Sequence, residues 1–256
     1  FRFRGDAVAG NGARNEFIEL YINKPADVTV GADGWAVSVF NPASSTASTI
    51  ALIPPGTILR AKSYYLIVNN SASSGFTFGA LASYPAAATP VPTTVGSGDL
   101  QYSADIPDGA GLAIFSSGAV LDSSTRLDSV GFASAGFFDP LYREGTGLTP
   151  VGGITVDGEY VFLRKSPNGA FIDTGDNEAD FVLIATDART YDGRVSQLGA
   201  PGPRAQTSGR PLPLPFTFIE PGIASNLPPN RGVDLSFTPN RLEFRFRVTN
   251  NTGQAI

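Results

Sequence analysis

The sequence predicts an all-β protein built as an antiparallel β-sandwich. Charged residues make up only 16% of the 256-residue chain, while 29 Gly and 20 Pro supply many turns; soluble proteins average roughly 25% charged residues. Short apolar runs with a two-residue period recur between clusters of turn residues. No segment has the 3.6-residue period of an amphipathic helix of useful length. Repeated strands without helices are typical of a sandwich.

Four strands are expected in the first 70 residues. The first is "NEFIELYI" at 15–22, and the second, at 34–40, stops at an Asn-Pro dipeptide. The third, at 48–54, ends in Pro-Pro-Gly, a strong turn signal. The fourth, "SYYLIVNN" at 63–70, is apolar at successive positions. Because strand side chains alternate between faces, we expect the fourth strand to be buried on both sides.

A low-complexity stretch follows at 71–104. Its small residues and prolines predict a long surface excursion rather than core. Regular strands then resume, and we expect them at 111–117, 126–133, 160–165 and 180–186.

The composition changes near residue 200 and divides the chain into three parts. Residues 1–204 are the expected sandwich, and 205–215, rich in Pro, Gly and small polar residues, are an expected semi-extended linker. Strand patterns return in 216–256. An immunoglobulin-type sandwich needs about 100 residues, so this tail is expected to form only an incomplete second β unit.

Seven segments carry a distinctive order along residues 1–204: "FRFRG" (1–5), "NEFIELYI", "GWAVSV" (34–39), "PPGTILRAKSYYLIVNN" (54–70), "GLAIFSSGAVLDS" (111–123), "LDSVGF" (127–132) and "IDTGDNEADFVLIAT" (172–186). A small-residue exit, "GAPGP" at 199–203, closes the series. This order resembles the lamin tail domain in its bacterial version.

The resemblance implies an immunoglobulin-like sandwich without catalytic activity. Bacterial members of this family are typically exported or attached to the cell surface, often beside other modules. The chain departs from the family by long insertions at 71–104 and around 133–155. It also lacks the coiled-coil heptads of nuclear filament proteins, so the nuclear role is not expected here.

The residue types that are absent narrow the possible chemistry. The chain has no Cys and no His, which excludes disulfides, thiolate nucleophiles, histidine-dependent triads and metal sites built on either residue. A glycosidase needs only two carboxylates and survives this filter. The net charge of −5, with scattered basic residues, disfavours a nucleic-acid partner. No apolar run is long enough to span a membrane, and no cofactor is expected.

Glu16 and Glu19 in the first strand are the first candidates for an acid–base pair. Side chains of a strand alternate between faces, so Glu16 shares a face with Ile18 while Glu19 takes the other. The two glutamates therefore point apart. We expect them to be structural, held by turn amides or a neighbouring Arg, rather than one half of a glycosidase pair.

The densest acidic cluster, "DTGDNEAD", is a calcium candidate. Ca²⁺ accepts 6–8 oxygen ligands, which this cluster could supply from Asp173, Asp176, Asn177, Glu178 and Asp180. The cluster lacks the ligand order of an EF-hand. Asp and Asn also bond to backbone groups in turns for structural reasons, and we expect that role, with calcium binding as the alternative.

Four smaller signals have structural interpretations. Arg4-Gly5-Asp6 spells an integrin-type tripeptide, but it ends an expected strand. Asn69 and Asn250 start glycosylation sequons that matter only in a glycosylating host. Trp35 could stack on sugars if it were exposed; we expect it to pack in the core instead.

The tail contains the strictest alternation in the chain. In 242–249, apolar residues take one face and polar residues the other, and the apolar ones are Leu242, Phe244, Phe246 and Val248. Burying each would stabilise the protein by roughly 1.5–3 kcal/mol. Either further chain completes a second sandwich, or these residues form an assembly interface by strand addition to a neighbouring subunit.

These observations predict a non-catalytic structural protein of the bacterial surface or extracellular matrix. We expect an exported chain whose signal segment lies outside the sequence. Its expected partners are copies of itself or another surface protein, joined through β contacts into a filament. The alternative is a glycan- or protein-binding accessory module of a secreted multidomain protein.

Overall fold

The computed structural model describes residues 1–3, 16–70, 98–134, 136–151, 160–166, 171–185, 190–191, 193–198, 203–206, 216–218, 231–234, 241–244 and 246–248. Side chains are not described for residues 191, 198 and 216–248. The chain forms two compact units. Unit 1 comprises residues 1–82 and 90–209, and unit 2 comprises residues 83–89 and 210–256. The described residues are mostly strands with almost no helix, which confirms the predicted all-β sandwich.

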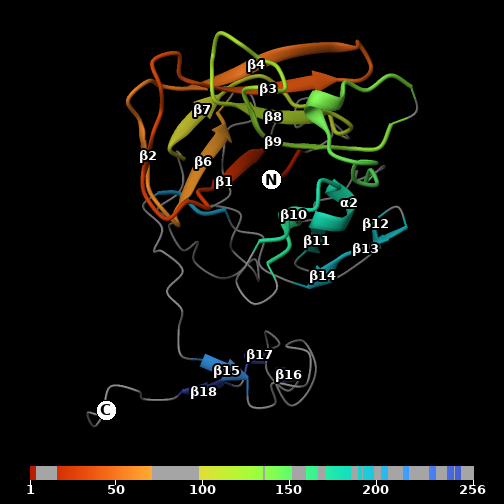
Figure 1. Ribbon diagram of the computed structural model, residues 1–256. Helices are drawn as coiled ribbons and strands as arrows, with labels where there is room; N and C mark the ends of the chain where they lie inside the picture. The colour runs from red at the N-terminus through yellow and green to blue at the C-terminus, as the bar shows by residue number, and fades with distance from the viewer. Residues whose placement is uncertain are drawn as a thin grey trace. The chain divides into compact units, whose positions relative to one another are not determined.

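The first layer of unit 1 is a four-stranded antiparallel sheet in the order β4-β3-β8-β9 (Figure 1). Its strands are β3 (Trp35–Asn41), β4 (Thr46–Ile53), β8 (Gly111–Phe115) and β9 (Arg126–Gly131). Ile50 has no partner on β3, because the register shifts between Val37 and Ser38. Such a bulge kinks an edge strand.

The second layer consists of two three-stranded groups, β1-β6-β7 and β10-β11-β14. Their bounds are β1 (Phe17–Tyr21), β6 (Tyr64–Asn69), β7 (Leu100–Tyr102), β10 (Tyr160–Arg164), β11 (Phe181–Ala185) and β14 (Gln197–Leu198). β1 is antiparallel to β6, and β10 is antiparallel to β11. The outer strands β7 and β14 run parallel to their neighbours.

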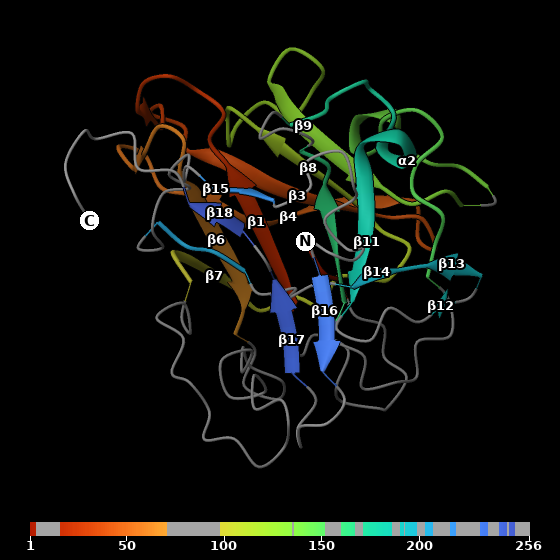
Figure 2. The ribbon, with the colours of Figure 1, turned by 90° about the horizontal axis from the view of Figure 1, so that it is seen from below.

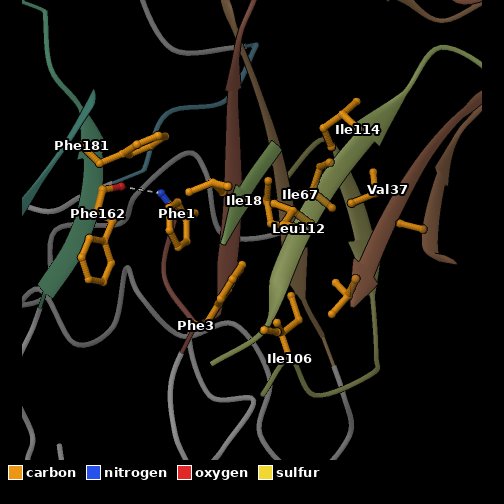
Figure 3. Packing of buried hydrophobic residues seen from close by; sticks show 14 of the residues in the cluster. Phe1, Phe3, Ile18, Val37, Ile67, Ile106, Leu112, Ile114, Phe162 and Phe181 are labelled. Carbon is orange, nitrogen blue, oxygen red and sulfur yellow. Dashed lines mark hydrogen bonds between the residues drawn. The ribbon is translucent and has the colours of Figure 1, made fainter. Parts of the chain in front are cut away.

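The first three residues join these two groups into one sheet. Arg2 exchanges backbone hydrogen bonds with Phe17 of β1, at 3.0 and 3.2 Å. Phe1 exchanges bonds with Phe162 of β10, at 2.9 Å from the Phe162 amide and 2.8 Å to its carbonyl (Figure 3). The N-terminus accordingly lies between β1 and the β10–β11 pair in the view from below (Figure 2). Residues 1–3 thus connect the two groups of the second layer through an isolated bridge at Arg2 and the hydrogen bonds of Phe1.

The main core lies between the two layers, because every strand alternates between faces. Val37, Leu112 and Ile114 of the first layer meet Ile18 and Ile67 of the second (Figure 3). Aromatic rings fill the end near the N-terminus: Phe1 stacks on Phe162 at 5.5 Å between ring centroids. β6 is buried along its whole length, as predicted from its apolar run.

The insertion around 133–155 covers the outer face of the first layer. It contains the short 3₁₀-helix η1 (Pro140–Tyr142), and Phe138 and Tyr142 pack on Phe40 and Phe115. Glycine is needed on the strand below it, because a Cβ on Gly111 would lie 2.5 Å from the ring of Phe138. The described residues of this insertion therefore form a second small core with the strands, rather than a free loop.

The outer face of the second layer has its own apolar cluster. Phe17, Leu66, Val68 and Val161 pack there with Ala205, a residue that we place at the start of the linker. Residues 203–206 thus lie on the strands of unit 1.

Part of the predicted surface excursion is core. Residues 71–97 lie outside the described residues, but 100–102 form β7, and Tyr102 is buried in the main cluster. Our prediction of surface for 71–104 is wrong at this end. The strand is only three residues long, too short for its periodicity to stand out from its flanking Gly, Ser and Asp.

Short elements complete unit 1. β2 (Val28–Thr29) pairs with β5 (Ile58–Leu59), and β12 (Thr190–Tyr191) pairs with β13 (Arg194–Val195). The one-turn helix α2 (Asn177–Asp180) precedes β11.

Unit 2 has four described strands paired two by two. They are β15 (Phe216–Phe218), β16 (Arg231–Asp234), β17 (Arg241–Phe244) and β18 (Phe246–Val248). β15 pairs with β18, and β16 pairs with β17, both antiparallel. Strand structure is thus present at the positions of the tail where the alternation predicts it.

Candidate functional site

Glu16 is buried at the start of β1, on the side of the main core. Its carboxylate accepts hydrogen bonds from Nδ2 of Asn69 at 3.0 Å, from the Ile106 amide at 3.3 Å and from the Tyr102 hydroxyl at 3.4 Å. Burial and the neighbouring carboxylate raise the pKa of Tyr102 well above its usual value. Glu16 therefore fastens the segment at 102–106 to the first strand. It is not a surface residue, but amides hold it as predicted.

Glu19 lies on the opposite face and binds an arginine. Its Oε1 accepts from the Arg204 Nη2 at 2.8 Å, and its Oε2 accepts from the Arg204 backbone amide at 2.5 Å. The same guanidinium lies 3.8 Å from the ring centroid of Tyr64 and donates to its hydroxyl. Glu19 thus ties residues 203–206 to the outer face of the second layer.

The two glutamates do not form a reactive pair. They leave β1 in opposite directions, and each is bonded to structural partners. The core side chain Glu16 and the outer-face side chain Glu19 cannot reach a common substrate atom.

The described ionisable groups are most crowded around Arg164 of β10. Its Nη2 donates to both carboxylate oxygens of Asp128 at 2.8 and 2.9 Å. Its Nη1 lies 3.4 Å from Asp173 and 3.4 Å from Asp180. One guanidinium therefore pairs with three carboxylates, from β9, α2 and the preceding loop, and the group keeps a net negative charge.

Glu144 is the fourth carboxylate of this group. Its Oε1 lies 3.8 Å from Nη2 of Arg126, and its side chain is 14% exposed. Burial, together with the charges of Asp128 and Asp173, raises the pKa of Glu144 to about 7, although the charges of Arg164 and Arg126 act to lower it. Partial desolvation also raises the pKa of Asp128, whose side chain is half-exposed, although Arg164 opposes this. This is the electrostatically strained region of the described chain.

Sequence reasoning missed this group, apart from Asp173 and Asp180. Asp128, Glu144 and Arg164 stand singly in separate segments, and only the order of strands in the folded layers brings them together. The visible signal was limited to a charged residue at the end of an otherwise apolar strand.

The acidic segment proposed for calcium has structural roles. Asp176 caps helix α2, accepting from the Glu178 amide at 3.1 Å. Asp180 is buried and accepts from the Thr174 amide and hydroxyl, while Glu178 pairs with Arg194 at 2.8 Å. These are the turn and cap bonds expected of Asp and Glu near a helix start.

Three carboxylate oxygens in this region lie within 4.8 Å of one another, from Glu144, Asp173 and Asp180. Arg164 already supplies positive charge beside two of them. The geometry therefore explains the crowding of acids without a metal ion, and it assigns none.

Asn177 closes the free edge of β9. Its Oδ1 accepts from the amides of Gly131 and Glu144, both at 3.0 Å, and its Nδ2 donates to the Ser129 carbonyl at 3.0 Å. One side-chain amide thus bonds to backbone groups of Ser129 and Gly131 with which an adjacent strand would otherwise pair.

The smaller candidates are also accounted for where they are described. Trp35 is half-buried and packs against the main core, as predicted. Asn69 is fully buried and bonded to Glu16 and the Ala104 carbonyl, so its sequon is closed to glycosylation in the folded chain. Arg4-Gly5-Asp6 and Asn250 lie outside the described residues.

The proposed interface residues occupy register positions in unit 2. Leu242 is opposite Val233, and Phe244 is opposite Arg231. Phe246 is opposite Phe218, and Val248 is opposite Phe216. The register fixes which backbones pair; the side chains of these strands lie outside the description.

Comparison with protein-family models, with curated proteins and with solved structures found no match. The class that the fold itself defines is an all-β sandwich. No helix within the described ranges has the length and apolar character that a bilayer span requires.

Proposed function

We propose that this chain is a non-catalytic structural protein of the bacterial surface or extracellular matrix. Its sandwich is of the lamin-tail, immunoglobulin-like type, and its subunits assemble through β contacts made by the C-terminal strands. Few charges and the lack of Cys support a place outside the cell. A chain without Cys has no thiol that an oxidising environment could modify.

The pairing of the unit 2 strands carries this proposal. Each described strand there has one partner, so the strands form two separate two-stranded ribbons. An isolated two-stranded ribbon is at best marginally stable in water. Each ribbon also has edge backbone groups that no other described strand takes. Addition of a strand from a neighbouring subunit would satisfy these groups and cover apolar surface.

The polar groups of unit 1 support a role without catalysis. Glu16, Glu19 and Arg164 each connect elements that are distant in the sequence. Chemistry based on two carboxylates would require them to converge on one substrate. In the described chain, the carboxylates that do converge are held by an arginine.

A contact between the tail of one subunit and a different surface of the next is heterologous. Contacts of this kind generate an open filament when the rotation between subunits does not close a ring. The proposal therefore predicts polymers of indefinite length rather than a dimer of fixed size.

Light scattering and electron microscopy of the purified full-length protein test the proposal. We expect filaments or a mass that grows with concentration, and we expect deletion of residues 216–256 to abolish both. A monodisperse monomer whose tail folds on its own sandwich would refute the proposal.

A further inference from the structure

The outermost strand of the first layer, β4, is an open edge. Among the described residues, its backbone pairs with β3 alone. It is eight residues long, and Thr46, Ala47, Ser48 and Thr49 are exposed. Unpaired edges of this length can accept an added strand.

The composition of β4 contains none of the features that protect natural edges. Edge strands are usually protected by Lys, Pro or inward-pointing charges. β4 reads "TASTIALI", and no charged residue occurs between Gly34 and Leu59. Within the described ranges, its bulge at Ile50 is the one protective feature, and the four residues before it continue as a regular ladder.

The opposite edge of the same sheet is covered at Ser129 and Gly131. Asn177 occupies the backbone groups of Ser129 and Gly131 on β9. Leu148 donates to the Gly131 carbonyl at 2.8 Å. The β9 edge is thus partly capped by the chain's own groups, while no described strand pairs with the outer edge of β4.

We infer that β4 is the acceptor for the C-terminal strands of a second copy, which rests on the proposed function and names the surface that receives the tail. Charge favours this occupant. Residues 1–206 carry 13 basic and 20 acidic residues, a net −7, and residues 207–256 carry 5 basic and 3 acidic, a net +2, which together give the −5 of the whole chain.

The same charges disfavour pairing of β4 with β4 of another copy. That contact brings together two sandwiches of net −7, whereas a tail of net +2 is attracted to a sandwich. β4 carries no charged residue, so it does not repel the arginines of β17 and β18. Exposed Asp33 lies near the end of β4 at Ile53. Its backbone carbonyl and the side chain of Leu52 on β4 both lie next to Gly118, where a Cβ would meet them. Addition at residues 46–49 therefore places the basic tail on uncharged backbone, with an acid beyond the other end of the strand.

Three full-length variants test the inference by light scattering. Ser48 is opposite Val39 of the core face yet exposed, so Ser48→Lys adds an inward charge to the edge that a new strand would bury. Leu127→Lys adds the same charge on β9, where Leu127 is 49% exposed at the capped edge, and serves as the matched control. Phe246→Pro removes a strand amide from the donor tail.

We expect the wild type and Leu127→Lys to assemble, and Ser48→Lys and Phe246→Pro to remain monomeric. A mixture of the last two is decisive. One retains a donor and the other an acceptor, so they should form a 1:1 complex that cannot grow. Assembly should also weaken as salt is raised.

Each other outcome overturns the inference in a distinguishable way. Failure of the wild type to assemble refutes the proposed function itself. Assembly of Ser48→Lys at the wild-type level leaves the tail as donor but removes β4 as acceptor. Dimers of Phe246→Pro would show that β4 pairs with itself. Absence of a complex in the mixture refutes the donor–acceptor pair, with equal melting temperatures of all variants as the folding control. If Ser48→Lys melts lower, Thr49→Lys repeats the test on the other face of the strand.

Discussion

Replacement of Glu144 by Gln should stabilise the protein at neutral pH and leave it almost unchanged at pH 4. Gln keeps the shape of the side chain and an oxygen that can accept from Asn177, whose Nδ2 lies 3.5 Å from the Glu144 Oε2. It removes the negative charge that burial, Asp128 and Asp173 disfavour. The variant thus isolates the electrostatic cost of one carboxylate.

The magnitude follows from the raised pKa of Glu144. The shift from 4.5 to about 7 corresponds to about 3 kcal/mol, at about 1.4 kcal/mol for each pH unit. Water reaches the group, so screening reduces the effect, and we expect about 1–2 kcal/mol. In sign, the folded state holds this proton more tightly than the unfolded state, so stability falls as pH rises from about 4.5 to 7 and is constant beyond.

Urea unfolding followed by fluorescence of Trp35, the single tryptophan, measures this difference at pH 4, 6 and 8. The stability gained by Glu144→Gln should appear across the titration window and be complete at pH 8. A gain that is the same at every pH, or a loss at pH 8, would refute the assignment of electrostatic strain to Glu144.

Further predictions concern the bonds that connect distant segments. Glu16→Ala leaves three buried donors without their acceptor and should cost about 3–5 kcal/mol of unfolding free energy, at about 1–3 kcal/mol for each buried group; a loss under about 1 kcal/mol in urea unfolding would contradict this. Arg204→Ala should cost about 1–2 kcal/mol, because it loses the paired bonds to Glu19 and the aromatic contact, and Arg204→Lys should recover only part in thermal melts, since it cannot form the paired bonds. Asn177→Ala should cost about 2–4 kcal/mol and expose the edge of β9, which hydrogen exchange at that strand would report. Calcium should leave the melting temperature unchanged and give no heat in titration, because Arg164, Arg194 and turn groups already bond to the acids; a saturable heat would reverse that interpretation.

The strands could be predicted because their signal is local. β3, β6 and β8 appear within two residues of their expected bounds, since two-residue alternation and flanking turns need no knowledge of the fold. The divergence of Glu16 and Glu19 followed from the same alternation. β7 was missed because three residues carry too little periodicity.

The convergence of charges could not be predicted in this way. Arg164 and Asp128 are 36 positions apart, and they meet only because the layers place β9 near β10. The partner of Glu19 is even more remote, at Arg204. Nothing in the composition of either segment specifies the other, because long-range neighbours follow from strand order rather than from local pattern.

The backbone contacts of residues 1–3 affect the order of folding. Phe1 must find Phe162, 161 positions along the chain, before the second layer becomes continuous. Closing such a distance costs loop entropy before any contact compensates for it, and contacts of this kind slow folding. Residues 1–3 are therefore among the last to reach their native neighbours. Until then, the second layer consists of two separate groups of strands, each with an open side where residues 1–3 will join them.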